Sequence, residues 1–170
     1  MVYLIVVVFL IVLRLFEVVW AKLNERFQQK RGGITVDDPY YTFVVLLHTG
    51  FLASLIVESF IAHQWSANTS DIWLTVFIVL QLLRFHVLMT LGRHWNTKVV
   101  VNPTSADRIK RGLFRYIDHP NYWIVLAELI VIPLLFEAYV TAILFPMGHL
   151  FFMSKRIPLE NEALTLYDKK

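Results

Sequence analysis

Residues 123–153, WIVLAELIVIPLLFEAYVTAILFPMGHLFFM, decide the fold class of this chain. A helix needs roughly 20 mostly apolar residues to cross a ~30 Å hydrocarbon core, and this run is well beyond that length. It also contains Pro133 and Pro146. We therefore expect two membrane segments, about 122–135 and 138–153, that form a helical hairpin turning near residues 136–138.

Three further apolar runs, 2–20, 41–62 and 72–91, each have the length of one membrane helix. Of the 170 residues, 57% are hydrophobic and 15% are aromatic, which argues against a soluble domain. The first run lacks a basic n-region and a small-residue cleavage site, so we expect a retained helix and not a signal peptide. The sequence thus predicts an all-α, polytopic integral membrane protein with about five transmembrane helices in a single domain over 1–170.

Basic residues are distributed unevenly between the connecting segments. They fall after the first run, in the loop 92–121 and in the C-terminal tail: Lys22, Arg26, Lys30, Arg31, Arg93, Lys98, Arg108, Lys110, Arg111, Arg115, Lys155, Arg156, Lys169 and Lys170. The loop 63–71 has none. The positive-inside rule then predicts an external N-terminus, with the basic loops and the tail in the cytoplasm. Membrane orientation explains the basic charge, so no nucleic-acid partner is expected.

Two polar clusters flank the hairpin run: GLFRYIDHPNY at 112–122 and RIPLENE at 156–162. Proline restricts the preceding residue to extended backbone and suits a first helical turn, so we expect an extended His119 and a helix from Pro120. The free N–H groups of such a turn favour an anion. Pro158 predicts a separate short cytoplasmic helix, 158–168. Arg156 keeps its charge and suits a carboxylate or another oxyanion.

Each cluster also has a plain structural interpretation. The first cluster is interpreted equally well as a turn at the membrane interface whose aromatic side chain lies at headgroup depth. The second cluster is interpreted as a solvated amphipathic tail. Within the spans, Glu128 either faces a cavity or is hydrogen-bonded in the bundle. The other ionisable span residues are interpreted as structural, through pairing, interfacial anchoring or packing: Arg14, Glu17, His48, Glu58, Arg84, His86 and His149.

The sequence lacks the residues and motifs of several common kinds of catalytic or binding site. The chain has no cysteine, which excludes disulfides and thiolate sites. It has no GxGxxG motif after a strand, no Walker loop, no GxSxG and no HExxH. We therefore expect no bound metal, and no Rossmann domain for a nucleotide-type cofactor.

The stretch from Leu83-Arg84 through Leu91-Gly92, Gly112 and 119–122 to Arg156 and Glu160 resembles the isoprenylcysteine carboxyl methyltransferase family. The resemblance covers about the C-terminal half. It implies an integral membrane enzyme that uses S-adenosylmethionine. It also implies a set of cofactor-binding residues: Arg108, Ile109, Phe114, His119, Pro120, Asn121, Tyr122 and Glu160. Arg156 would act catalytically beside the acceptor, and His119 would serve as a base for a hydroxyl or would shape the backbone.

The resemblance has three departures, one of which is a tail without the family's fuller FGxxY-like ending, and it leaves the acceptor open. Asp118 stands where the family usually has arginine, and 160–162 reads Glu-Asn-Glu where paired glutamates are usual. We expect O-methylation of a carboxylate or acidic hydroxyl on a lipophilic acceptor, such as a long-chain alkylpyrone, at a bacterial cell membrane with the active site facing the cytoplasm. The alternatives are a phospholipid N-methyltransferase, an NADPH-dependent membrane reductase, and a membrane scaffold or transporter subunit. The oligomeric state stays open.

Overall fold

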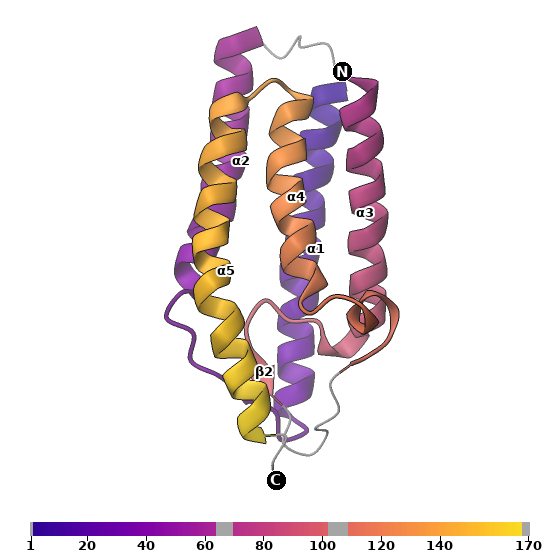
Figure 1. Ribbon diagram of the computed structural model, residues 1–170, viewed down its shortest axis with the longest axis vertical. Coiled ribbons are helices and arrows are strands. Elements are labelled where there is room, and N and C mark those ends of the chain that lie inside the picture. The colour runs from indigo at the N-terminus through magenta and orange to yellow at the C-terminus, as the bar shows by residue number, and fades with distance from the viewer. Residues whose placement is uncertain (1, 64–69, 102–108, 168–170) are drawn as a thin grey trace.

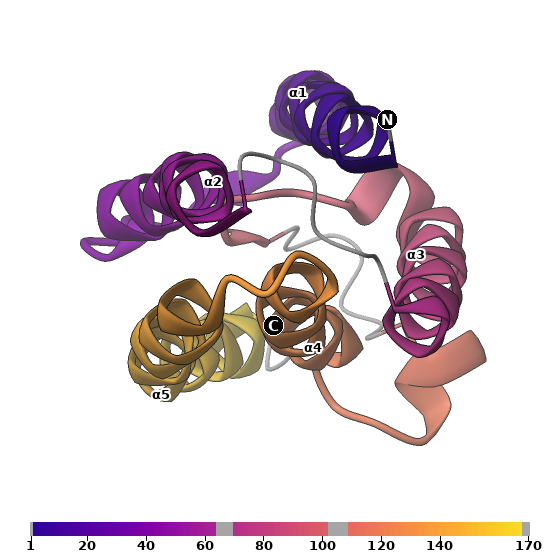
Figure 2. The ribbon, with the colours of Figure 1, turned by 90° about the horizontal axis from the view of Figure 1, so that it is seen from above.

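The computed structural model describes residues 2–63, 70–101 and 109–167, and most of them belong to five long helices. These are α1 (Val2–Gln29), α2 (Tyr41–His63), α3 (Asp71–Leu91), α4 (Pro120–Leu135) and α5 (Tyr139–Tyr167). All five run along the long axis of the molecule (Figure 1). Seen from above, α4 lies between α3 and α5, α2 lies beside α5, and α1 faces α4 across the bundle (Figure 2). The all-helical prediction is confirmed.

Among the described residues, three helical stretches are long and apolar enough to cross a membrane: Tyr3–Gln29, Tyr41–Ala62 and Asp71–His94. α4 is a shorter apolar helix of 16 residues. The outer surface of the bundle is strongly apolar, as the exposed side chains show: Leu4, Ile5, Val12, Leu46, Leu82, Phe85, Ile143 and Leu144. Such a surface suits lipid and not water. The count of five spanning segments stays a prediction.

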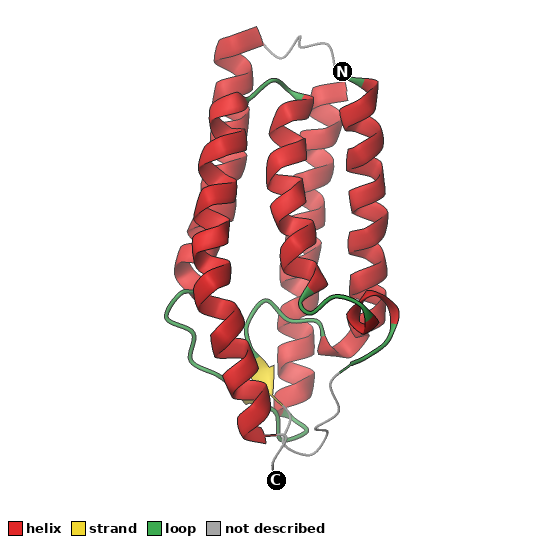
Figure 3. Cartoon of the chain, in the orientation of Figure 1, coloured by secondary structure: helices red, strands yellow, loops and turns green. Residues whose placement is uncertain are grey.

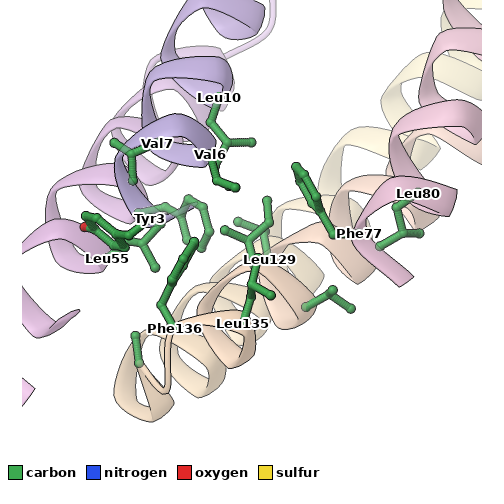
Figure 4. Packing of buried hydrophobic residues seen from close by; sticks show 14 of the residues in the cluster. Tyr3, Val6, Val7, Leu10, Leu55, Phe77, Leu80, Leu129, Leu135 and Phe136 are labelled. Atoms are coloured by element: carbon green, nitrogen blue, oxygen red, sulfur yellow. The ribbon is translucent and has the colours of Figure 1, made fainter. Parts of the chain in front are cut away.

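The hairpin turns where the sequence indicates. α4 ends at Leu135, and α5 begins at Tyr139. Glu137 takes the left-handed conformation (φ 57°), the Ala138 N–H donates to the carbonyl of Pro133 (2.9 Å), and the Glu137 N–H donates to that of Leu134 (3.4 Å). This is the Schellman arrangement that ends a helix and reverses the chain. Phe136, which follows the last residue of α4, packs edge-on against Tyr3 in the hydrophobic core shown in Figure 4.

α1 is longer than the predicted span 2–20, because its last turns bind another part of the chain. Asn24 and Gln28 are buried on the same face of the helix. The Asn24 side-chain amide donates to the carbonyls of Gly92 (3.0 Å) and Trp95 (2.9 Å), and that of Gln28 donates to the carbonyl of Arg93 (2.7 Å). The extension therefore fixes the short 3-10 helix η1 (Gly92–His94) at the foot of α3.

The predicted separate helix 158–168 is wrong, because α5 continues without a break through Pro146 and Pro158. Proline removes one backbone hydrogen bond from a helix interior. Here side chains on both sides of Pro158 are held by other elements, Arg156 by the α1–α2 connection and Glu160 by the start of α4. These contacts keep the helix continuous.

The three segments assigned to the cytoplasm lie together at the end of the bundle that holds the C-terminus (Figure 1). The α1–α2 connection carries β1 (Ile34–Thr35), which pairs antiparallel with β2 (Val100–Val101) of the α3–α4 connection. β2 is the strand marked in Figure 3. Ala163 near the end of α5 packs in a buried cluster with Val99 and Val101. The loop 92–121 is thus partly structured among its described residues.

Candidate functional site

A cavity of about 500 Å³ opens among the helices at this end of the bundle. α1, α2, α3, α4, α5 and the segment after η1 all contribute side chains to its wall. α5 contributes a stripe at helical spacing: His149, Phe152, Met153, Arg156, Glu160 and Leu164. Residues three and four apart share a helix face, so one face of α5 lines the cavity along much of its length.

The HPNY turn (119–122) and α5 meet at one side of this cavity. Glu160 Oε2 accepts a hydrogen bond from the Tyr122 hydroxyl (3.3 Å) and lies 3.3 Å from His119 Nδ1. His119 Nε2 lies 3.1 Å from the Asn161 side-chain oxygen. The hydrogen bond with Glu160 raises the pKa of His119 above its usual value, although partial burial opposes this. The arrangement favours a charged imidazolium that donates from both ring nitrogens.

The extended backbone expected for His119 is wrong. His119 caps α4 in the left-handed conformation, with φ 54° and ψ 50°, and the helix begins at Pro120 as predicted. A residue before proline rarely adopts this conformation, and its cost is tolerated only where the surroundings fix it. The contacts to Glu160 and Asn161 fix the His119 ring and supply that constraint.

Gly112 brings the preceding loop against α3. Its φ is +59°, and a Cβ there would lie 2.7 Å from His86 Nε2 and 3.0 Å from Thr90 Oγ1. Only glycine satisfies both the left-handed backbone and this close approach. The following 3-10 helix, η2 (Gly112–Arg115), then places the Phe114 side chain in the cavity wall.

Arg156 lines the cavity but is also a structural clamp. Its side chain is 8% exposed, and its Nε lies 2.7 Å from Asp38 Oδ2 in the α1–α2 connection. A terminal nitrogen donates to the Thr97 carbonyl (2.9 Å). Arg156 therefore joins α5 to both connections beneath the cavity. Asp38 escaped the sequence analysis because its partner lies 118 residues away.

A second group of charges closes the membrane-facing part of the cavity. Arg84 pairs with Glu17 and with Glu128 (2.6 Å), and Arg14 pairs with the same two carboxylates at 3.0 and 2.9 Å. The Gln81 amide donates to Glu128 (2.9 Å). The predicted pairing of Arg14 with Glu17 is confirmed, and Glu128 is hydrogen-bonded in the bundle. Arg84 is 3% exposed, so its interpretation as an interfacial anchor is wrong.

Four buried polar atoms in the cavity-lining residues have no hydrogen-bonding partner among the described residues. They are Trp95 Nε1, Asn96 Oδ1, Asn121 Oδ1 and His149 Nδ1. Buried polar atoms without partners are costly, so their concentration at a cavity indicates a polar ligand. Trp95, Asn96 and His149 were not among the predicted site residues. The sequence gives no signal for the first two, since isolated polar residues in loops are common.

The predicted site residues divide into three groups. Those that line the cavity are Phe114, His119, Asn121, Tyr122, Arg156 and Glu160. Pro120 is buried beneath the turn, and Ile109 is half-buried outside the cavity wall. Arg108 lies outside the described residues. Asp118, the departure from the family pattern, is exposed and lies beside His119 in the chain.

Comparisons with known proteins bear on the same region. The family model of the isoprenylcysteine carboxyl methyltransferase (ICMT) family matches residues 73–166, from α3 to the end of α5. A Bacillus subtilis protein described as "Uncharacterized protein YpbQ" is 36% identical over 164 residues, which cover 95% of each chain. A Haemophilus influenzae protein described as uncharacterized is 28% identical over 137 residues, or 79% of this chain and 78% of its own length. No solved structure matches the chain.

Proposed function

Because this chain belongs to the isoprenylcysteine carboxyl methyltransferase family, we propose that it is a membrane methyltransferase that uses S-adenosylmethionine and methylates an oxygen of a lipophilic acceptor. The observation that supports this best is the cavity wall built by the HPNY turn and Glu160, beside buried polar atoms that have no partner in the described part of the chain. Helices that are long and apolar enough to span a membrane contribute to the wall of this cavity, which suits a lipophilic acceptor.

The residues present fit the chemical groups of the cofactor. Glu160 is a partly exposed carboxylate that suits an ammonium or ribose hydroxyls. Among the described residues, no group pairs with the side-chain N–H of Trp95, a donor, or with the side-chain oxygen of Asn121, an acceptor. The volume of about 500 Å³ lies within the usual range for small-molecule sites. We assign cofactor binding to this end of the cavity, through Phe114, His119, Pro120, Asn121, Tyr122 and Glu160.

The reaction requires little covalent chemistry from the protein itself. S-adenosylmethionine, when bound, supplies a methyl group on an activated sulfonium. The chain has to align the acceptor oxygen with that group and exclude water. Arg156 orders the floor of the cavity, where its charge is paired with Asp38 and a terminal nitrogen donates to the Thr97 carbonyl. A long-chain alkylpyrone is one acceptor that combines an acidic hydroxyl with a lipophilic chain.

The cavity favours a methyltransferase over an NADPH-dependent reductase. A 2′-phosphate needs arginine side chains that are free to bind it. Among the described residues, the arginines in the wall are Arg14, Arg84 and Arg156, and each is paired with a carboxylate. We place the protein in a bacterial cell membrane, with five spanning segments in one domain and the cavity facing the cytoplasm. The external N-terminus follows from the same charge distribution.

Calorimetry on the detergent-solubilised protein tests this function. We expect S-adenosylhomocysteine to bind and NADPH not to bind. Glu160→Gln should weaken S-adenosylhomocysteine about 10–100-fold, because a hydrogen bond to a charged group contributes about 1.5–3 kcal/mol. Glu162→Gln is the matched control, since this glutamate is exposed on the same helix and lies outside the cavity. Binding of NADPH alone would favour a reductase, and binding of neither would favour a scaffold.

A further inference from the structure

His149 lines the cavity, and one of its ring nitrogens has no hydrogen-bonding partner among the described residues. The residue lies on α5 and is 4% exposed. Its Nε2 lies 3.1 Å from the backbone carbonyl of Tyr122. A carbonyl oxygen only accepts hydrogen bonds, so the proton of the ring sits on Nε2. In a neutral imidazole the other nitrogen, Nδ1, then carries a lone pair.

The surroundings of His149 favour this neutral form. Its Nδ1 is buried and has no hydrogen-bonding partner among the described residues. Before an acceptor binds, a second proton on Nδ1 would have no group to donate to, so the resting ring is neutral. Two permanent cations, Arg14 and Arg156, also line the cavity and oppose a third positive charge. Nδ1 is thus a hydrogen-bond acceptor of a residue that lines the cavity beside His48, whose ring centroid lies 6.2 Å from that of His149.

A series of rings places His149 next to the cofactor end of the cavity. The centroids of His119 and Tyr122 are 5.8 Å apart, and those of Tyr122 and His149 are 6.4 Å apart. The cavity wall also includes Val44, Leu52 and Val125, which suit a lipophilic molecule. A cofactor held by His119, Tyr122 and Glu160 would leave His149 beside the polar end of such an acceptor.

We propose that His149 is the base of the reaction and that the acceptor presents a hydroxyl group to it. This inference rests on the proposed function. A hydroxyl donates a hydrogen bond to the Nδ1 lone pair, whereas a carboxylate carries no proton and would meet that lone pair with its own. During transfer, the hydroxyl oxygen forms a bond to the methyl carbon and the carbon–sulfur bond breaks with its electron pair on sulfur. The hydroxyl proton passes to Nδ1.

The substitution His149→Gln isolates this role. The glutamine amide can still donate to the Tyr122 carbonyl, but it has no basic nitrogen. The probes are 4-nonylphenol and its more acidic 2-nitro derivative, with radiolabelled S-adenosylmethionine. A general base contributes about 10²–10⁴-fold, so we expect that loss of turnover with 4-nonylphenol. The loss should be much smaller with the nitrophenol, which ionises without help, and S-adenosylhomocysteine should bind normally.

His86→Gln is the matched control, because His86 is an exposed histidine of α3 outside the cavity wall. It should leave both rates unchanged. If His149→Gln fails to fold, His149→Ala with added imidazole replaces it, and imidazole should restore part of the 4-nonylphenol rate.

Three outcomes test the base assignment, the hydroxyl assignment and the proposed function separately. Equal losses with both phenols, or no imidazole rescue, would overturn the base assignment alone. Wild-type protein that binds S-adenosylhomocysteine and methylates neither phenol would overturn the hydroxyl assignment alone. Failure of wild-type protein to bind S-adenosylhomocysteine would overturn the proposed function itself.

Discussion

His119 joins the two polar clusters of the sequence through its side chain. Its ring contacts Glu160 and Asn161, which lie 41 and 42 positions later in the chain, and both contacts come from α5. The left-handed backbone of His119 turns the ring toward α5 at the point where α4 begins. At the scale of single residues, the candidate site is therefore a contact between a strained helix cap and the far half of a helix.

The raised pKa of His119 predicts a pH-dependent stability. The folded state favours the charged imidazolium, so the stabilisation is complete below the unfolded value of about 6.5 and is lost as pH rises through the raised folded value. Glu160→Gln should lower the melting temperature by about 1–4 °C at pH 5.5, for a loss of about 0.5–1 kcal/mol. The difference should largely vanish at pH 9. Glu162→Gln should show no such dependence, and a constant difference across pH would contradict the prediction.

The buried pair of Arg156 with Asp38 should be strongly coupled. Removing one partner leaves an uncompensated buried charge, so Arg156→Gln or Asp38→Asn should each destabilise the protein by roughly 3–5 kcal/mol. The double variant should lose much less stability than the sum of the two single losses. Unfolding by SDS in mixed micelles would measure the free energy of unfolding of the wild type and of all three variants. The half-exposed pair of Lys98 with Glu25 is the control, and Glu25→Gln should cost under about 1 kcal/mol. Additive losses for the buried pair would show that no coupling exists.

Among the elements, α5 does the most to build the site. One face runs from His149 through Arg156 to Glu160, so three different chemical groups line the cavity in a fixed order. A break at Pro158 would let Glu160 move independently of His149. Because the helix is continuous, the position of its first turn also determines where Glu160 meets His119.

Glu58 of α2 fixes that first turn. Its two carboxylate oxygens accept hydrogen bonds from the N–H groups of Val140 and Thr141, both at 2.8 Å, and the Thr141 hydroxyl donates to it as well (2.6 Å). A carboxylate at a helix N-terminus satisfies free donors and opposes the helix dipole. Glu58→Ala should cost about 1–2 kcal/mol in the same SDS titration.

Two variants distinguish capping from simple loss of packing at Glu58. Glu58→Gln keeps one acceptor and should lose about half as much as Glu58→Ala. Thr141→Val removes the hydroxyl and leaves both backbone hydrogen bonds, so it should also lose less. An undiminished stability of Glu58→Ala would show that the cap contributes nothing.

For the whole molecule, the described parts of the connections that the charge rule assigns to the cytoplasm lie at one end of the bundle (Figure 1). The cluster of Arg14, Glu17, Arg84 and Glu128 holds four charges inside the bundle with no net charge. Unpaired charges at membrane depth are very costly, so this cluster ties α1, α3 and α4 together. It also forms the inner end of the cavity.

The absence of cysteine makes the membrane orientation directly testable. Single cysteines at the exposed positions Ser70, Lys30 and Lys110 report on the two ends of the bundle. In intact cells, a membrane-impermeant maleimide should label Ser70→Cys. It should label Lys30→Cys and Lys110→Cys only after lysis. The reverse pattern would invert the proposed orientation and place the cavity on the outer side.

The sequence by itself determined the helical membrane class, the hairpin turn at 136–138 and the segment that carries the family resemblance. These depend on apolar run length, on charge distribution and on short motifs, which are local properties of the chain. The helix start at Pro120 belongs with them, because proline acts on its own turn.

Only the tertiary structure decided which polar groups meet. Asp38 beneath Arg156, Glu128 beside Arg84 and His149 behind Tyr122 are contacts between distant segments. The left-handed His119 and the unbroken α5 were also decided there, because side-chain contacts overrode the local preference that proline imposes. A pattern along the chain records the local preference, whereas the packed bundle determines which of these preferences prevails.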